Sequence, residues 1–445
     1  MMKLVVIGGV AAGMSAAARA KRRNKNLDIT VYEKSGYVSY GACGLPYFIK
    51  GDIPTAEKLV VRTPEQFAKQ GIKALVHHEV IDVDVTERTV TVKNLETGEA
   101  FQDDWDELLI TTGAVAVKPP IPGLDLSGIF TLRTVEDGFA IKDWIARKHP
   151  WQAVVVGGGY IGLEMAEALA ANGMYVDVVE MLPQVLPNMD ADMAALVEET
   201  LSRHGVSVHL ESPVRAFEGD GRVQRVIAGD KTLEADLVLF SVGARANIPL
   251  AEKAGVAIGE TGAIAVDDHQ RTTVPHVWAA GDVAEAWHRV LNKPAYIPLG
   301  TTANKQGRIA GTNIAGGDAA FGGIVGTAVV KVFDLEVART GLSEREAEQA
   351  GLDAASVTIK APARAHYMPT HPPIHIKLVF DKGTKKLLGG QMVGEEGVSK
   401  RIDVIAAALH NGWTVYDLSQ LDLSYAPPFA PVWDPILVAA NVASK

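Results

Sequence analysis

Short apolar runs that end in glycine recur along the chain, and they predict buried strands of a parallel sheet. Residues 3–9 (KLVVIGG) form one such run, and the Ala-rich stretch after it predicts a helix. A second apolar run, residues 28–34 (DITVYEK), ends beside the acid Glu33. A strand, a glycine turn, a helix and a second strand in this order predict a βαβ unit.

The same pattern occurs a second time. Residues 152–159 (QAVVVGGG) predict a strand, a helix follows through Ala171, and residues 175–181 (YVDVVEM) form a strand that ends beside Glu180. Later strands repeat as well, because residues 106–113 (DELLITTG) and 236–243 (DLVLFSVG) share an Asp, six residues and a Gly. Two such units in one chain predict two nucleotide-binding domains.

The C-terminal part of the chain has a different pattern, with short strands and no further glycine fingerprint from about residue 323. The elements predicted there are a helix that begins at Ser343 with a capping box to Glu346, a hairpin of residues 374–380 and 387–393, and a helix over residues 400–411 that ends at Gly412. The fold class expected is α/β, with two Rossmann-like domains and a C-terminal α+β domain.

Composition and charge narrow the function. The chain has 445 residues, enough for about three domains, and its net charge of −10 argues against nucleic acid or an anionic membrane as a partner. A single cysteine excludes an intrachain disulfide and a CxxC zinc site. No uncharged run reaches the length of a membrane span, and the N-terminal run is broken by glycines, so we expect a cytoplasmic protein.

The second glycine turn matches the dinucleotide fingerprint at every position, with Gly157, Gly159 and Gly162. Its glycines allow a pyrophosphate to approach the backbone at a helix N-terminus. Glu180 lies where an acid can accept a hydrogen bond from a ribose 2′-hydroxyl and repel a 2′-phosphate. We therefore expect NADH to be preferred over NADPH.

The first glycine turn keeps Gly8 and Gly13, but Val10 replaces the middle glycine. Glu33 again follows at the spacing of a ribose contact. Further along, a buried strand over residues 272–282 ends in Gly281-Asp282, where an acid could bind the ribityl chain of a flavin. Two nucleotide sites with this motif indicate a flavin that takes hydride from a nicotinamide.

Cys43 lies among glycines in residues 39–47 (SYGACGLPY). A lone cysteine is most often a small buried hydrophobe. Here a helix that starts next to it would stabilise the thiolate. Such a thiolate beside a flavin can attack a disulfide and form a mixed disulfide.

The chain resembles the pyridine nucleotide–disulfide oxidoreductases, in particular the single-cysteine branch of coenzyme A disulfide reductases and NADH oxidases. The resemblance rests on SYGACGLPY, GGGYIGLE at residues 157–164, AAGD at 279–282 and LSYAPPFAPVWDP at 423–435. It implies a homodimer with the following organisation: FAD-binding residues 1–115 and 246–322, NAD(P)H-binding residues 116–245, and dimerisation residues 323–445.

The resemblance also implies the site residues. Those assigned to FAD are Gly8, Gly13, Glu33, Lys34, Thr112, Gly113, Arg133, Gly281 and Asp282. Those assigned to NADH are Gly157, Gly159, Tyr160, Ile161, Gly162, Glu164, Glu180 and Gly243, with Tyr160 covering the nicotinamide pocket and swinging aside. Cys43 is the redox centre, Tyr367 and Tyr425 reach it across the dimer, and Arg19, Arg22 and Ser39 are the coenzyme A contacts.

The electron acceptor has several candidates. Ala11 stands where oxidases of this branch usually carry a histidine, which favours reduction of coenzyme A disulfide, with the cysteine held as a mixed disulfide with coenzyme A. Ala42 and Trp433 depart from the better-known reductases and keep a persulfide or polysulfide as a second candidate. An NADH oxidase and a non-catalytic flavin redox sensor also fit the motifs. We expect no fused rhodanese-like domain.

Three histidines, His366, His371 and His375, lie close together in the segment HYMPTHPPIH. The segment has three prolines, no carboxylate and no regular ligand spacing, so we expect no metal site there.

Overall fold

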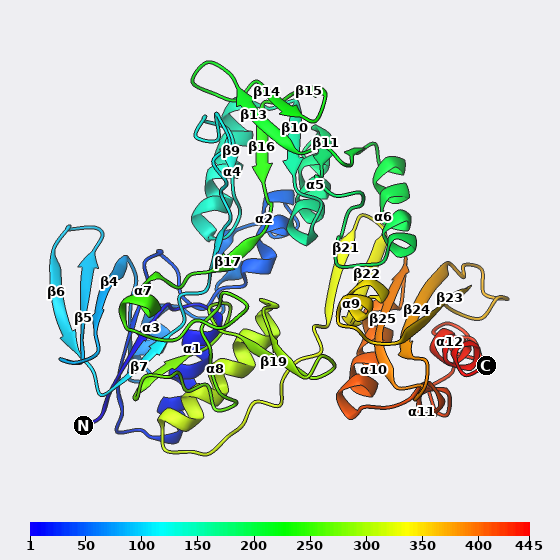
Figure 1. The fold of residues 1–445 in the computed structure, drawn as a ribbon. Coiled ribbons are helices and arrows are strands. Elements are labelled where there is room, and N and C mark those ends of the chain that lie inside the picture. The colour runs from blue at the N-terminus through cyan, green and yellow to red at the C-terminus, as the bar shows by residue number, and fades with distance from the viewer.

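The first nucleotide-binding unit is a five-stranded parallel sheet in the computed structural model, which describes residues 1–445 (Figure 1). The strand order is β18-β7-β1-β2-β3, with β1 (Lys3–Ile7) at the centre. The other strands are β2 (Asp28–Tyr32), β3 (Ile72–Leu75), β7 (Glu107–Ile110) and β18 (Val277–Ala279). Two helices, α1 (Ala11–Arg23) and α8 (Gly300–Ile314), pack against each other beside this sheet. Segments far apart in the sequence thus form one unit.

The second unit repeats this arrangement with the strand order β12-β11-β10-β16-β9. Its strands are β9 (Ile129–Phe130), β10 (Gln152–Val156), β11 (Tyr175–Val179), β12 (Ser207–His209) and β16 (Leu237–Phe240), and its helices are α4 (Val135–Lys148), α5 (Tyr160–Ala171) and α6 (Ala191–Arg203). β10 pairs in parallel with β11 and β16, as β1 pairs with β2 and β7. The predicted internal repeat is confirmed.

Small antiparallel elements complete the two units, and the sequence patterns did not predict them. They are a sheet of β4 (His78–Asp84), β5 (Thr89–Asn94) and β6 (Ala100–Asp104), a sheet of β13 (Val214–Glu218), β14 (Arg225–Ala228) and β15 (Lys231–Glu234), and the pair β19 (Ala286–His288) with β20 (Lys293–Ala295). The strand β8 (Ala114–Ala116) follows Gly113 of the first unit, and β17 (Ala244–Ala246) follows Gly243 of the second. These two strands pair with each other and so join the two units.

The C-terminal part is a five-stranded antiparallel sheet with the order β21-β22-β25-β24-β23. Its strands are β21 (Ala328–Val332), β22 (Leu335–Gly341), β23 (Ala354–Pro362), β24 (Pro373–Asp381) and β25 (Leu387–Gly394), and its helices are α9 (Glu344–Gln349), α10 (Val398–Asn411), α11 (Val415–Ser419) and α12 (Pro435–Ala443). The predicted hairpin, the capping box and the stop at Gly412 are all present. The expected fold class is confirmed.

The short helix α2 (Leu45–Lys50), which follows Cys43, belongs to the core of the second unit. Its Leu45, Phe48 and Ile49 lie in one cluster of 33 buried residues together with side chains from β10, α5, β21 and β22. The remaining short helices are α3 (Pro64–Ala68) and α7 (Pro249–Lys253). None of the helices has the length and apolar character that a membrane crossing requires.

Candidate active site

The two glycine turns have the same geometry and the same reason for their glycines. Gly8 has φ +102°, and a Cβ there would lie 2.3 Å from the Thr111 carbonyl oxygen. Gly157 has φ +107°, and a Cβ there would lie 2.2 Å from the Ser241 carbonyl oxygen. In each turn the strand beside the glycine leaves no room for a side chain, so the backbone runs close to the neighbouring strand.

The acid after each second strand binds its own glycine turn. Glu33 accepts hydrogen bonds from the backbone N–H groups of Gly9 (2.7 Å) and Ser35 (2.8 Å). Glu180 accepts from Gly158 (2.8 Å) and Leu182 (2.9 Å). Both acids are buried, and their carboxylates thus face the turn where a ribose would lie.

Both nucleotide-binding units have open space beside their glycines. Gly113 and Gly243 lie three residues after β7 and β16, and Gly159 directly precedes α5; at all three an added Cβ would meet no atom within 4 Å. Open space at these three points is where a pyrophosphate would pass along each unit. The residues present therefore fit one dinucleotide in each unit.

The turn at Gly281-Asp282 lies beside the first glycine turn. A Cβ at Gly281 would lie 2.8 Å from the Cβ of Ala12, and the buried Gln306 accepts a hydrogen bond from the Gly281 N–H. Asp282 lies 3.7 Å from the Arg133 guanidinium. Burial raises the pKa of Asp282, and Arg133 opposes that rise. These contacts place the Asp282 carboxylate and Arg133 together next to the first unit.

Cys43 lies in a 3₁₀ turn, η1 (Ala42–Gly44), directly before α2, and its side chain is exposed. The predicted helix start is present, since α2 follows η1 directly, but the surroundings of the Cys43 thiol together raise its pKa. Surrounding protein atoms raise the pKa of the Cys43 thiol, as do the carboxylates of Glu164 and Asp282. Arg133 is the cation that lowers it.

A hydrogen bond from Tyr47 to Glu164 joins α2 to α5 next to Cys43. The Tyr47 hydroxyl donates to Glu164 Oε1 over 3.1 Å. Burial raises the pKa of Glu164 to about 7, although the Tyr47 hydrogen bond works in the opposite direction. Glu164 can therefore hold or release a proton near neutral pH. Tyr47 ends the SYGACGLPY motif, but the sequence gave it no role.

Glu167, one turn further along α5, ties α2 to the C-terminal part. Its Oε1 is 3.0 Å from Lys50 Nζ of α2 and 2.9 Å from Lys331 Nζ of β21, and its Oε2 accepts the Phe333 N–H over 2.7 Å. Two more groups hold α2 to the second unit, since Lys142 and Asn172 donate to the carbonyls of Phe48 and Ile49. The segment after Cys43 is thus fixed by the second unit.

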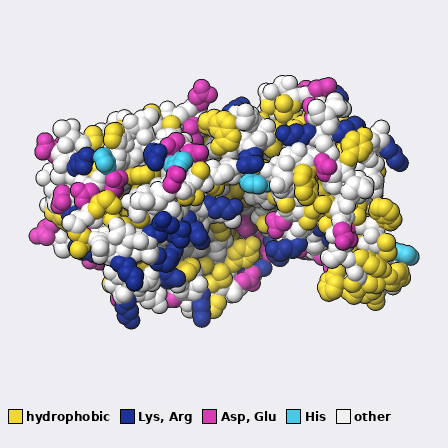
Figure 2. Space-filling view, turned by 90° about the horizontal axis from the view of Figure 1, so that it is seen from below, with side chains coloured by type: hydrophobic (Ala, Val, Ile, Leu, Met, Phe, Trp, Pro, Cys, Tyr) yellow, Lys and Arg dark blue, Asp and Glu magenta, His cyan; other side chains and the backbone are white.

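The residues predicted to contact coenzyme A are carried by the first unit. Arg19 donates to Thr312 Oγ1 of α8 over 2.9 Å, and Arg22 is exposed at the end of α1. The exposed Lys305 and Arg308 lie on α8, which packs along α1. Figure 2 shows Lys and Arg side chains gathered on the lower face. Ser39 has φ +50°, and its N–H bonds the Gly9 carbonyl, so it lies against the first glycine turn.

Tyr367 and Tyr425 lie together, because their hydroxyl oxygens are 3.1 Å apart. Both are exposed on the C-terminal part. In Figure 1 the loop between β23 and β24, which carries Tyr367, lies on the far side of the C-terminal sheet from α2. The two tyrosines therefore do not meet Cys43 within one chain.

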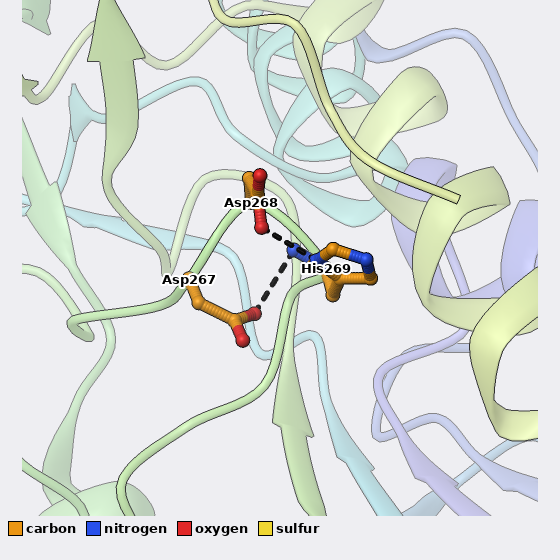
Figure 3. A group of neighbouring side chains, drawn as sticks. All are labelled: Asp267, Asp268 and His269. Carbon is orange, nitrogen blue, oxygen red and sulfur yellow. Dashed lines mark hydrogen bonds and ion pairs between the residues drawn. The ribbon is translucent and has the colours of Figure 1, made fainter. Parts of the chain in front are cut away.

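A cluster of Asp267, Asp268 and His269 lies on a loop of the first unit (Figure 3). Both ring nitrogens of His269 already have carboxylate partners, Asp268 at 2.5 Å and Asp318 at 2.9 Å. Asp267 accepts from the backbone N–H groups of His269 and Arg271. These contacts stabilise the turn, and we assign no metal site to the cluster.

The chain combines two nucleotide-binding units, a lone exposed thiol at their junction and a separate antiparallel domain. This combination is that of an oxidoreductase that binds two dinucleotides. Family models agree. The model described as pyridine nucleotide-disulphide oxidoreductase matches residues 2–307, and its dimerisation-domain model matches residues 327–435. The chain belongs to the pyridine nucleotide-disulphide oxidoreductase family.

Individual relatives match along nearly the whole chain. The NAD(P)H coenzyme A polysulfide/persulfide reductase of Pyrococcus horikoshii is 42% identical over 442 residues, 99% of this chain and 98% of that protein. A structure of an NAD-dependent persulfide reductase from A. fulgidus superposes with a TM-score of 0.97 at 41% identity, over 100% of this chain and 83% of that one. The reduced CoADR-RHD of Bacillus anthracis has a TM-score of 0.97 and 40% identity, over 99% and 80%.

These findings define the enzyme class. The chain is a FAD-dependent NAD(P)H oxidoreductase of the group that contains coenzyme A disulfide reductases, NADH oxidases and persulfide reductases. The predictions of family, enzyme class and FAD with NAD(P)H as cofactors are confirmed at this level.

Proposed function

We propose that the enzyme uses NADH to reduce coenzyme A persulfide or polysulfide at Cys43. Ala11, where oxidases of the group carry a histidine, favours disulfide reduction over oxygen reduction. The similarity to persulfide and polysulfide reductases at 41–42% identity supports a persulfide or polysulfide over coenzyme A disulfide as the acceptor. The observation that carries the proposal is the exposed thiol of Cys43, the one cysteine of the chain, beside a carboxyl group with a pKa of about 7.

Because the chain has a single cysteine, the proposed reaction uses one thiol and a mixed disulfide with coenzyme A. When bound, FAD would accept hydride from NADH and supply two electrons to a sulfur centre. The Cys43 thiolate attacks the inner sulfur of coenzyme A persulfide, so that a Cys43–S–S–CoA disulfide forms and hydrosulfide leaves. Two electrons then break that bond and return the Cys43 thiolate and, with one proton, coenzyme A. The sum is NADH, H⁺ and coenzyme A persulfide giving NAD⁺, coenzyme A and H₂S.

Glu164 is the proposed proton carrier of this reaction. Its pKa of about 7 lets it hold a proton at neutral pH, and Tyr47 fixes its orientation. Its charge also acts on the pKa of the Cys43 thiol. A neutral Glu164 favours the thiolate that attacks, and its proton can then pass to the departing sulfur.

The nucleotide contacts are proposed from the two repeated turns. The group proposed for FAD consists of Gly8, Gly13, Glu33, Lys34, Thr112, Gly113, Arg133, Gly281 and Asp282. The group proposed for NADH consists of Gly157, Gly159, Tyr160, Ile161, Gly162, Glu164, Glu180 and Gly243. The buried carboxylate of Glu180, which already accepts two backbone N–H groups, supports NADH over NADPH, since a 2′-phosphate there would bring like charges together.

Coenzyme A is proposed to lie along α1 toward Cys43. Arg19 and Arg22 would bind its phosphates, and the exposed Lys305 and Arg308 on the adjoining α8 add charge of the same sign. Ser39, held against the first glycine turn, would contact the pantetheine. The anionic substrate is thereby matched to a basic surface on a chain whose net charge is −10.

A homodimer would complete the site. Tyr367 and Tyr425 lie away from Cys43 of their own chain, and their segment exposes further apolar side chains: Phe429, Val432 and Trp433. The match to a dimerisation-domain model supports covering this face with a second copy. The two phenol groups would then reach the partner's thiol site and stabilise a departing thiolate.

Replacing Cys43 with serine tests the proposal. Under anaerobic conditions the wild type should release one H₂S for each NADH oxidised with coenzyme A persulfide. Cys43→Ser should lower that release by about a thousandfold or more, while NADH still bleaches its flavin. Ala42→Ser, which adds a hydroxyl one residue earlier in the same turn, is the matched control and should keep activity. Full H₂S release by Cys43→Ser would overturn the mechanism.

A further inference from the structure

The side chain of Tyr160 is held by a residue that the sequence motifs do not mark. Tyr160 is the first residue of α5, and Asn188 Nδ2 donates to its hydroxyl oxygen over 2.9 Å. Asn188 lies 28 residues later, in the loop between β11 and α6. Its amide thus reaches the start of the helix that faces the second glycine turn.

This loop packs on the glycine turn itself. The Leu186 N–H bonds the Gly158 carbonyl over 2.9 Å, and a Cβ at Gly158 would lie 3.0 Å from Val185. Inside the loop the buried Gln184 donates to the Met189 carbonyl over 2.9 Å. Asn188 is therefore part of a braced segment next to the nucleotide turn.

The C-terminal part holds the same loop from the other side. Arg339 of β22 donates to the Asn188 carbonyl, and Arg345 of α9 donates to the Pro187 carbonyl. Gln391 of β25 exchanges two hydrogen bonds with Asp190, accepting its N–H over 2.8 Å and donating to its Oδ2 over 2.6 Å. The position of Asn188 is thus set by the dimerisation sheet.

We infer that Asn188 is a positioning residue that holds Tyr160 in the closed position over the nicotinamide pocket, and that the dimerisation domain fixes this latch through Asn188. The inference rests on the proposed NADH site, and on the expectation from the family resemblance that Tyr160 moves aside for the nicotinamide. Because opening breaks the Asn188–Tyr160 hydrogen bond, the bond lowers the fraction of enzyme that is open to ligand. One neutral hydrogen bond corresponds to about a two- to tenfold change in apparent affinity.

A double-mutant cycle tests the latch by equilibrium binding. Calorimetric titration of the oxidised holoenzyme with NAD⁺ should give a Kd that falls about two- to tenfold in Asn188→Ala. Tyr160→Phe, which removes only the oxygen, should give a similar decrease. The double variant should bind no more tightly than either single variant. Independent, additive effects, or no decrease in Kd, would overturn the latch.

A surface variant tests the role of the dimerisation domain. Arg345 is exposed, and Arg345→Ala releases the Pro187 carbonyl with little risk to folding. The Kd for NAD⁺ should fall in the wild-type background and stay constant in the Asn188→Ala background. Equal effects in both backgrounds, or none in either, would refute the coupling. Bleaching of the flavin by NADH is checked separately, because its absence would refute the nicotinamide site and not the latch.

Discussion

Single glycines in this enzyme divide into those that the fold needs and those that a ligand needs. Gly162 belongs to the first kind, because a Cβ there would lie 2.0 Å from the Gly157 carbonyl oxygen. Gly159 belongs to the second, because a Cβ there would meet no protein atom within 4 Å and its φ of −81° suits any residue. The fingerprint alone does not separate these two roles.

We therefore expect Gly159→Ala to keep its thermal stability and to lose nucleotide affinity. Its melting temperature should stay within about 2 °C of the wild type, while the KM for NADH should rise about tenfold or more, because the methyl group enters the pyrophosphate path. Gly162→Ala, the matched control, should lose about 1–3 kcal/mol of stability. Unfolding scans and NADH kinetics decide this, and an unchanged KM in Gly159→Ala would contradict the assignment.

Glu164 should give Cys43 a pH-dependent reactivity. The pKa of Glu164 is raised to about 7, so its carboxyl is mostly neutral at pH 6 and charged at pH 8. The charged form raises the thiol pKa and opposes the thiolate. Glu164→Gln should alkylate with iodoacetamide at about the wild-type rate at pH 6 and about three- to tenfold faster at pH 8. Superimposable pH profiles of the two proteins would contradict this coupling.

At the scale of elements, the helix pair α1 and α8 depends on glycines at its crossing. A Cβ at Gly307 would lie 2.3 Å from the Ala12 carbonyl, and one at Gly311 would lie 2.2 Å from the Ala16 carbonyl. The two backbones touch here, which brings Arg19 and Arg22 of α1 next to the cations of α8.

Gly307→Ala should accordingly lower stability by about 1–3 kcal/mol, since the helices must separate. Gly300→Ala provides the matched control on the same helix, because a Cβ there meets nothing within 4 Å. That variant should be neutral or more stable by about 0.4–1 kcal/mol. Chemical denaturation of both variants measures the difference. Equal stabilities would mean that the crossing tolerates a wider spacing.

The elements that the sequence predicted are those whose reason is local. Glycine turns and apolar runs predicted β1, β2, β10 and β11 within three residues of their observed ends, and Ser343 with Glu346 predicted the start of α9. The sequence did not predict α12, because its residues are apolar on every side and have no helical period. The short antiparallel sheets lacked a repeated motif.

At the scale of the whole molecule, the contacts that complete the site could not be predicted from the amino-acid sequence. Tyr47 and Glu164 are 117 residues apart, and Glu167 joins residues of three separate segments. Asn188 likewise contacts Tyr160 from a loop that Arg339 of the C-terminal sheet also bonds. Tyr47 and Glu164 each lie in a motif, but the motifs do not show that the two side chains meet, because that contact arises from tertiary packing. The predicted domain boundaries and the individual site roles stay predictions.

The measurement that tests the central claim most directly is anaerobic NADH oxidation with coenzyme A persulfide and coenzyme A disulfide in parallel. The account predicts a kcat/KM for the persulfide at least about tenfold above that for the disulfide, with one H₂S released for each NADH, because hydrosulfide is the leaving group when the Cys43 thiolate attacks. A higher kcat/KM for the disulfide, or NADH oxidation that begins only when oxygen is admitted, would contradict it.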